Sequence, residues 1–313
     1  MLAVKREARM PNILYTLEKK TVEAEESETI LQVSMRTGVP HAHACGGNAR
    51  CSTCRVLILD GLEYCEARNA NEQLLADRLN FTPEIRLACQ TTFNGDLTLR
   101  RLVLDDEDIQ LAGQQTAAGA ACSVGEEKQL AVLFADIRGF TPFAEALPPY
   151  DVVHVLNRYF HRMGAVISRN GGSIDNYMGD GLMALFGMKD STNAALNAVR
   201  AGLEMIDAME LLKPYLEMTY SRTFEIGIGI HFGEVVVGAI GGQSLRRVTA
   251  IGDAVNLASR IEAANKNAGT RLLVSNETYE EVKDHVRVGN TVCVSLPGKT
   301  GEYSLREIVG LHG

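Results

Sequence analysis

Four cysteines in the N-terminal third of the chain have a spacing that suits metal or cluster ligation. Cys45, Cys51 and Cys54 form a C-x5-C-x2-C pattern, and Cys89 follows farther along the chain. This spacing is close to the C-x4-C-x2-C…C spacing of [2Fe–2S] ligation, because a loop that carries three thiolates can wrap around a compact cluster. Zinc is the alternative, although zinc sites usually show two C-x2-C knuckles.

The residues around these cysteines give weaker signals. Gly46 and Gly47 let backbone N–H groups approach the sulfur atoms of the loop. His41 and His43 precede the first cysteine, where they could tune a cluster or face solvent, and we expect both to be exposed. We expect the remaining cysteines to be ordinary small apolar residues: Cys65, Cys122 and Cys293.

Two aspartates in the C-terminal half stand where strands are predicted to end. Asp136 follows the apolar run LAVLFA, and Asp180 lies between two glycines that separate SIDNYM from LMALFG, as in a hairpin turn. If these strands are neighbours, both carboxylates reach one edge of a sheet. Paired carboxylates suit Mg²⁺ or Mn²⁺ and leave sites open for phosphate oxygens. For Asp180 alone, simple turn chemistry is the alternative.

Two further segments carry groups that suit phosphate chemistry. The segment 138–141 (RGFT) leads into a predicted helix, so its backbone N–H groups could cradle phosphate oxygens. In the helix predicted from IGDAVNLASRIEAA, Asn256 and Arg260 are four residues apart and share one face. A guanidinium there can meet charge that grows on a phosphate, while the amide orients an attacking group. A solvated helix face is the alternative.

Length and composition limit the organisation of the chain. At 313 residues, two domains are expected. A net charge of −8 without a basic run argues against nucleic-acid binding. The N-terminal segment MLAVKREARMPN is charged where a secretory signal would be apolar, and no apolar run reaches the roughly 18 residues of a membrane span. We therefore expect a soluble, cytoplasmic protein that does not contact a membrane.

The elements that must position these groups fall into two blocks. Residues 11–104 read as short strands with a helix at ILQVSMRTG, and the acidic, Ala- and Gly-rich residues 105–127 suit a connector. Residues 128–310 alternate apolar strands with amphipathic helices, and EIGIGIHFGEVVVGAIGG reads as two strands around Gly233-Glu234. For the helix over 150–168 we predict one apolar face: Val153, Leu156, Phe160, Met163 and Ile167.

The segments HACGGNARCSTCRVLIL and RLACQTTFNGDLTL resemble β-grasp [2Fe–2S] ferredoxins, with the five-residue first spacing of the adrenodoxin-like branch. This resemblance covers about residues 11–104. It implies that Cys45, Cys51, Cys54 and Cys89 hold a [2Fe–2S] cluster, which an electron donor could reduce.

Four segments resemble class III adenylyl and guanylyl cyclases in order and spacing: FADIRGFT, IDNYMGDGLMALFG, GIGIHFGEVVVGAIG and TAIGDAVNLASRIE. The resemblance implies an α+β protein, in which a ferredoxin-like α/β sandwich follows the β-grasp domain. It also implies that Asp136 and Asp180 hold two Mg²⁺ or Mn²⁺ ions, with the carbonyl of Ile137 assisting.

The same resemblance implies roles for groups that contact the nucleotide. Phe140 and Thr141 would line the triphosphate, and Lys299 is a looser candidate for the terminal phosphate. Asn256 and Arg260 would act in the transition state. In such enzymes the metal pair and the Asn/Arg pair of one site come from different subunits, so a head-to-tail homodimer is expected.

Base choice in these cyclases depends on two positions, which are Asn176 and Thr249 in this chain. Thr249 fits adenine, whereas Asn176 departs from both the adenylyl and the guanylyl pattern, and its amide can donate and accept. ATP is the expected substrate and GTP stays open. We expect the redox state of the cluster to regulate the cyclase. The alternative is an electron-carrying ferredoxin whose cyclase-like half only dimerises or binds nucleotide.

Overall fold

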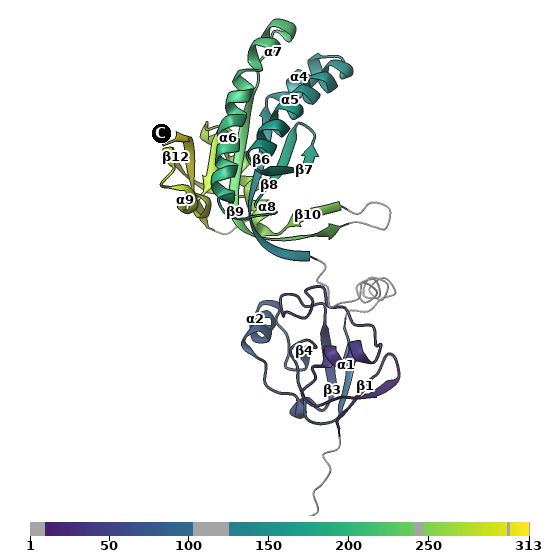
Figure 1. Ribbon diagram of the computed structural model, residues 1–313. Coiled ribbons are helices and arrows are strands. Elements are labelled where there is room, and N and C mark those ends of the chain that lie inside the picture. The colour runs from purple at the N-terminus through teal and green to yellow at the C-terminus, as the bar shows by residue number, and fades with distance from the viewer. Residues whose placement is uncertain (1–9, 103–124, 241–246, 299–300, 313) are drawn as a thin grey trace, which may run out of the picture. The chain divides into compact units, whose positions relative to one another are not determined.

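A computed structural model describes residues 10–102, 125–240, 247–298 and 301–312 (Figure 1). The chain forms two compact units, Met1–Gly125 and Glu126–Gly313. Most of the predicted connector 105–127 lies outside the described residues, as do Cys122 and Lys299. No helix in the described part of the chain is long and apolar enough to cross a membrane.

The N-terminal unit is built on a five-stranded sheet with the strand order β2-β1-β5-β3-β4. β1 pairs antiparallel with β2 and parallel with β5, so the sheet is mixed. In the described part of this unit, two α-helices and a short 3-10 helix, η1, join the strands. The elements are β1 (Asn12–Tyr15), β2 (Lys20–Glu23), α1 (Ile30–Arg36), β3 (Arg55–Asp60), η1 (Leu62–Tyr64), α2 (Ala70–Leu79), β4 (Ile85–Leu87) and β5 (Leu97–Arg101).

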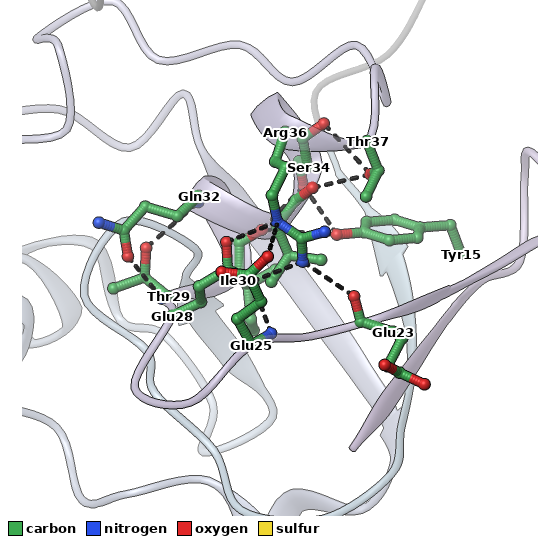
Figure 2. Close-up of polar contacts among 11 residues, drawn as sticks. Tyr15, Glu23, Glu25, Glu28, Thr29, Ile30, Gln32, Ser34, Arg36 and Thr37 are labelled. Atoms are coloured by element: carbon green, nitrogen blue, oxygen red, sulfur yellow. Dashed lines mark hydrogen bonds and ion pairs between the residues drawn. The ribbon is translucent and has the colours of Figure 1, made fainter. Parts of the chain in front are cut away.

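Helix α1 is fixed at both ends, which matters because the cysteine loop follows it. Its first turn has a capping box, in which Gln32 N–H donates to the Thr29 hydroxyl and Thr29 N–H donates to the Gln32 side chain. Near the other end, Arg36 pairs with Glu28 at 2.6 Å and donates to the carbonyl of Glu23 (Figure 2). The helix therefore lies in one position against the β1–β2 hairpin.

The C-terminal unit contains an eight-stranded sheet with the order β12-β13-β11-β9-β6-β8-β7, and β10 pairs with β9. Helices and strands mix in both units, which confirms the predicted α+β class. The strands are β6 (Gly125–Arg138), β7 (Gly172–Met178), β8 (Gly181–Phe186), β9 (Glu225–Ile240), β10 (Arg247–Ile251), β11 (Leu272–Ser275), β12 (Val286–Ser295) and β13 (Glu302–Leu311). The helices are α4 (Phe140–Ala146), α5 (Pro149–Arg169), α6 (Ala194–Glu210), α7 (Lys213–Tyr220), α8 (Asp253–Ala268) and α9 (Asn276–Val282).

Alternate residues of β6 enter different cores, because successive side chains of a strand point to opposite faces. Ala131 and Leu133 pack with α5 and α6, whereas Leu130 and Val132 pack in a second cluster that includes Ala254 of α8. In Figure 1, α5 and α6 lie side by side along the sheet. The prediction that LAVLFA is a strand buried on both faces is confirmed, so the strand that carries Asp136 is held rigidly.

Two details of the sequence prediction need correction. The helix over 150–168 forms as α5, with Met163 and Ile167 of its predicted face buried and Leu156 and Phe160 partly buried against the core. The prediction is wrong for Val153, because it is 55% exposed, and the buried face also includes Val155 and Tyr159. The predicted break at Gly233-Glu234 is absent, because β9 runs unbroken through both residues. Gly233 does not mark a turn. A Cβ at this position would lie 2.7 Å from Nε2 of His231, so the glycine avoids a clash with that ring.

Candidate functional sites

The four cysteines predicted to hold a cluster gather as two close pairs. A hydrogen bond from the thiol of Cys51 lowers the pKa of Cys45 to about 4, and one from Cys54 lowers the pKa of Cys89 to about 7. The pKa of the other thiol rises in each pair. One thiolate of each pair is thus stabilised by its neighbour, as in a site that collects negative sulfur ligands.

Hydrogen-bond donors surround these sulfur atoms. Backbone N–H groups of residues 47, 48 and 50 stabilise the Cys45 thiolate, and the side-chain amide of Gln90 lies 3.4 Å from Sγ of Cys89. Gly47 has a φ of +87°, a conformation that side chains rarely adopt, and it lies between Leu31 and Cys89. The loop therefore brings N–H groups close to sulfur, as expected for a cluster site.

The paired arrangement of the cysteines bears on the choice between a cluster and a single zinc ion. A two-iron cluster needs two thiolates for each iron, and the two pairs supply them. The residues fit a [2Fe–2S] cluster better than the zinc alternative.

The prediction that His41 and His43 are exposed is wrong, because only 2% and 1% of their surfaces are accessible. His41 Nε2 lies 3.2 Å from the carbonyl of Cys54, and its Nδ1 lies 2.9 Å from the hydroxyl of Ser34. Burial lowers the pKa of His41 to about 3, so the ring is neutral. The Nδ1 of His43 lies 2.7 Å from the carbonyl of His41.

These contacts define a hydrogen-bonded chain. A carbonyl only accepts, so neutral His41 donates from Nε2 to Cys54, and its Nδ1 is an acceptor that faces the Ser34 hydroxyl, which also has the carbonyl of Ile30 at 2.9 Å. The Tyr15 hydroxyl, 2.8 Å from Ser34 Oγ, completes the chain (Figure 2). This series of hydrogen bonds joins β1 and α1 to the cysteine loop. Sequence reasoning missed Tyr15 and Ser34, since nothing local marks their contact with the loop.

The remaining cysteines differ from one another. Cys65 is half-buried, and burial raises the pKa of its thiol. Cys293 is exposed on β12, so the prediction of a small apolar residue does not describe its position.

In the C-terminal unit the structure places Asp136 and Asp180 together. Antiparallel pairing of β6 with β8 sets Ala135 opposite Leu182, so Asp136 meets the β7–β8 turn that carries Asp180. A Cβ on Gly181 would lie 3.2 Å from Oδ1 of Asp136, so the glycine leaves room beside the carboxylate. Burial, and next the charge of Asp180, raise the pKa of Asp136 to about 6. Two carboxylates this close repel unless a proton or a cation is shared.

Sequence reasoning missed two groups beside this pair. Burial raises the pKa of Glu262 on α8 to about 7, and Asp136 and Asp180 act in the same direction while Arg138 opposes them. The hydroxyl of Tyr159 is buried without a hydrogen-bond partner among the described residues, and burial and the same two aspartates raise its pKa. Both contacts depend on how α5 and α8 pack on the sheet, which no local spacing reveals.

The residues predicted to line the triphosphate lie at the start of α4, just after β6. Ile137, whose carbonyl is predicted to assist the metal ions, is buried near the end of β6. Phe140 begins α4 and packs against Phe143 and Phe224, with ring centroids 5.9 and 6.3 Å away. Thr141 is exposed. Their roles stay predictions.

Asn256 and Arg260 both lie on α8, and Asn256 is exposed. The Arg260 guanidinium lies against Gly298, 3.2 Å from where a Cβ would stand. Within the described part of the chain, no hydrogen bond or ion pair joins this pair to Asp136 or Asp180. The same helix brings Glu262 near the two aspartates, and the meeting of Asn256 and Arg260 with them stays a prediction.

Asp175 links the two positions that are predicted to contact the base, Asn176 and Thr249. The Thr249 hydroxyl on β10 donates to Oδ2 of Asp175 on β7 at 2.7 Å, and Asp175 directly precedes Asn176. Arg247 also reaches that oxygen, at 3.3 Å. Sequence reasoning missed Asp175.

Comparison with known proteins matches both units. A family model described as "Adenylate and Guanylate cyclase catalytic domain" matches residues 123–306, and one described as "2Fe-2S iron-sulfur cluster binding domain" matches residues 15–94. An adenylate cyclase of Anabaena cylindrica is 35% identical over 206 residues, 64% of this chain and 40% of that protein. Adenylate cyclase 1 of Rhizobium meliloti is 30% identical over 59% of this chain and 28% of that protein. The chain thus spans less than half of the length of these relatives.

Two solved structures resemble the C-terminal unit. The guanylyl cyclase Cya2 has a TM-score of 0.57 and 37% identity over 60% of this chain and 95% of its own. The adenylyl cyclase CyaB from P. aeruginosa has a TM-score of 0.55 and 31% identity over 59% of this chain and 95% of its own.

Proposed function

Because the chain belongs to the adenylate and guanylate cyclase catalytic domain family and also carries a 2Fe-2S cluster binding domain, we propose that it is an adenylate cyclase that converts ATP to cyclic AMP and pyrophosphate. The observation that carries this proposal is the pair of half-buried carboxylates, Asp136 and Asp180, at one edge of the sheet. The adenylate cyclases among its relatives support ATP as the substrate.

The reaction forms a bond between the ribose 3′ oxygen and the α-phosphorus, and breaks the bond from that phosphorus to the bridging oxygen of pyrophosphate. Asp136, Asp180 and the carbonyl of Ile137 would hold two Mg²⁺ or Mn²⁺ ions, which stabilise the attacking and leaving oxygens when bound. The triphosphate would lie along Phe140 and Thr141 at the start of α4.

The second half of the site comes from α8. Asn256 would orient the ribose so that the 3′ oxygen lies in line with the leaving group, and Arg260 would meet the charge on the α-phosphate. Gly298 packs against Arg260 and directly precedes Lys299, the looser candidate for binding the terminal phosphate. Positioning supplies most of the catalysis in this scheme.

A head-to-tail homodimer would bring Asp136 and Asp180 of one subunit to Asn256 and Arg260 of the other. Apolar side chains that a second copy could cover are exposed on β7, β9 and β10. They are Tyr177, Met178, Val236, Ile240, Val248 and Ile251. Exposed apolar residues gathered on neighbouring strands are typical of a protein interface.

One assay tests this function directly. Purified full-length protein with Mn²⁺ or Mg²⁺ is expected to make cyclic AMP from ATP, and to stop when EDTA removes the metal ions. Cyclic GMP as the main product would make the chain a guanylate cyclase, a second candidate supported by its similarity to Cya2. Production of neither nucleotide would leave an electron-carrying ferredoxin with a non-catalytic cyclase-like half.

The cluster gives the enzyme a way to respond to redox state. A free-energy difference of about 1.4 kcal/mol between oxidised and reduced protein would change an active-to-inactive ratio tenfold. We expect different cyclase rates for protein reduced with dithionite and protein oxidised in air, and a Cys54→Ser variant should lose the difference. Equal rates in wild-type protein would contradict regulation. The cysteines of the described residues form no disulfide, and this feature and ATP as substrate suit the cytoplasm, where a donor could reduce the cluster.

A further inference from the structure

Asp175 interrupts the regular pairing of β7 and contacts β10. The register between β7 and β8 shifts between Ile174 and Asn176, which leaves Asp175 in a bulge. Its side chain is 6% exposed and accepts hydrogen bonds from Thr249, at 2.7 Å, and from Arg247, at 3.3 Å. The bulge thus turns a nearly buried carboxylate toward a residue 74 positions away.

The direction of the Thr249 bond follows from the chemistry of its partners. A carboxylate accepts and does not donate, so the Thr249 hydroxyl gives its only hydrogen to Asp175. The guanidinium of Arg247 is only a donor, so it leaves the carboxylate in that accepting role. Thr249 Oγ1 therefore presents only lone pairs to any further partner.

The two purine nucleotides differ at the atom that such an oxygen would meet. Adenine carries an amino group at C6, which donates, whereas guanine carries an oxygen there, which accepts. A threonine oxygen with only lone pairs binds the amino group and repels the oxygen. The amide of Asn176, next to Asp175 in the sequence, can donate to N1 of adenine, which accepts.

On the basis of the function proposed above, we propose that Asp175 is a specificity-determining residue of the site. By taking the hydroxyl hydrogen of Thr249, it makes the site select a nucleoside triphosphate with a 6-amino purine over one with a 6-oxo purine. Asp175 acts through Thr249 and not by touching the base, because its carboxylate is nearly buried and already accepts two hydrogen bonds.

The test compares kcat/KM for ATP, GTP and inosine triphosphate in the wild-type protein and in Asp175→Asn. Inosine triphosphate has the 6-oxo group without the 2-amino group of guanine, so it isolates the C6 position. The new amide can donate to Thr249 Oγ1 and release its hydrogen for a 6-oxo group. We expect the preference for ATP over inosine triphosphate to fall at least tenfold, about 1.4 kcal/mol.

Two further variants separate this mechanism from a general disturbance. Thr249→Val removes the accepting oxygen, so the ATP preference should fall, and adding Asp175→Asn should change it no further. Asp207→Asn, a substitution of an exposed acid on α6, should leave the preference unchanged. The inference is overturned if Asp175→Asn or Thr249→Val keeps the wild-type preference within twofold, or if the wild-type protein prefers inosine triphosphate or GTP.

Nucleotide affinities test the role of Asp175 even if the chain is not a cyclase. The affinities for 3′-deoxy-ATP and 3′-deoxyinosine triphosphate, which lack the attacking hydroxyl, can be measured by calorimetry with Mn²⁺. If no turnover is found but Asp175→Asn reduces the binding preference for 3′-deoxy-ATP over 3′-deoxyinosine triphosphate tenfold, the proposed function is rejected and the role of Asp175 is supported. If neither turnover nor this reduction is found, both are rejected.

Discussion

The N-terminal unit brings the four predicted cluster cysteines into two pairs within one chain, with N–H donors already placed on the sulfur atoms. The C-terminal unit brings two carboxylates together, and among the described residues Arg260 makes no hydrogen bond or ion pair with them. Polar groups also differ: the buried hydroxyl of Tyr15 is hydrogen-bonded, whereas that of Tyr159 has no partner among the described residues. We therefore expect a single chain to complete the site of the N-terminal unit, and metal ions, nucleotide and a second subunit to complete that of the C-terminal unit.

The largest expected effect tests whether the C-terminal site is shared between subunits. Asp136→Ala removes a proposed metal ligand and Arg260→Ala removes a proposed transition-state contact, so each variant should lose at least about 10³-fold in activity. Mixed in equal amounts, the two inactive proteins should regain about a quarter of wild-type activity, because half of randomly formed dimers hold one intact site. Cyclic AMP formation after co-refolding or co-expression measures this recovery.

The control for that experiment uses two changes on the same half of the site. A mixture of Asp136→Ala with Asp180→Ala should stay inactive, since no pairing of those chains assembles an intact site. Equal recovery in both mixtures, or recovery in neither, would contradict a site shared between subunits.

The cluster should behave in the opposite way. Cys45→Ser and Cys89→Ser each remove one member of a different pair, so each protein should lose the visible absorbance of the cluster. Mixing the two should restore nothing, because one chain supplies all four thiolates. Cys65→Ser, which changes a half-buried cysteine outside the pairs, should keep its absorbance. Iron and zinc analysis decides the metal, and zinc without iron in the wild-type protein would reject the cluster.

The features that the sequence predicts correctly are those set by residues close together in the chain. The cysteine loop and the Gly-Asp-Gly turn place their groups through local geometry, and the unbroken apolarity of LAVLFA predicts a strand buried on both faces. Glu262, Asp175 and Tyr159 escaped prediction because each gains its role from a residue far along the chain. Periodicity also says which helix face is apolar but not where the neighbouring helix lies.

A smaller effect is expected from breaking the hydrogen-bonded chain that joins Tyr15, Ser34 and His41 to the cysteine loop. Ser34→Ala leaves the buried Nδ1 of His41 without a donor, which should cost about 1–3 kcal/mol of the stability of the N-terminal unit. Calorimetry of the full chain should show a lower melting temperature for that unit alone, and the cluster should be lost faster on heating. An unchanged transition would mean that Ser34 bonds the carbonyl of Ile30, 2.9 Å away, and not His41.

The smallest effects come from removing one buried hydroxyl in each unit, and they should have opposite signs. Tyr15→Phe removes a hydroxyl that bonds Ser34 at 2.8 Å, so it should destabilise the N-terminal unit by about 1 kcal/mol. Tyr159→Phe removes a buried hydroxyl without a partner among the described residues, so in EDTA it should raise the stability of the C-terminal unit by a similar amount, about 2–4 °C. Both rings are fully buried, so the two substitutions remove the same group from comparable surroundings. If Tyr159→Phe instead lowers the melting temperature in EDTA, the hydroxyl has a hydrogen-bond partner in the metal-free protein. The contrast between a buried hydroxyl with a partner in one unit and one without a partner in the other then does not hold.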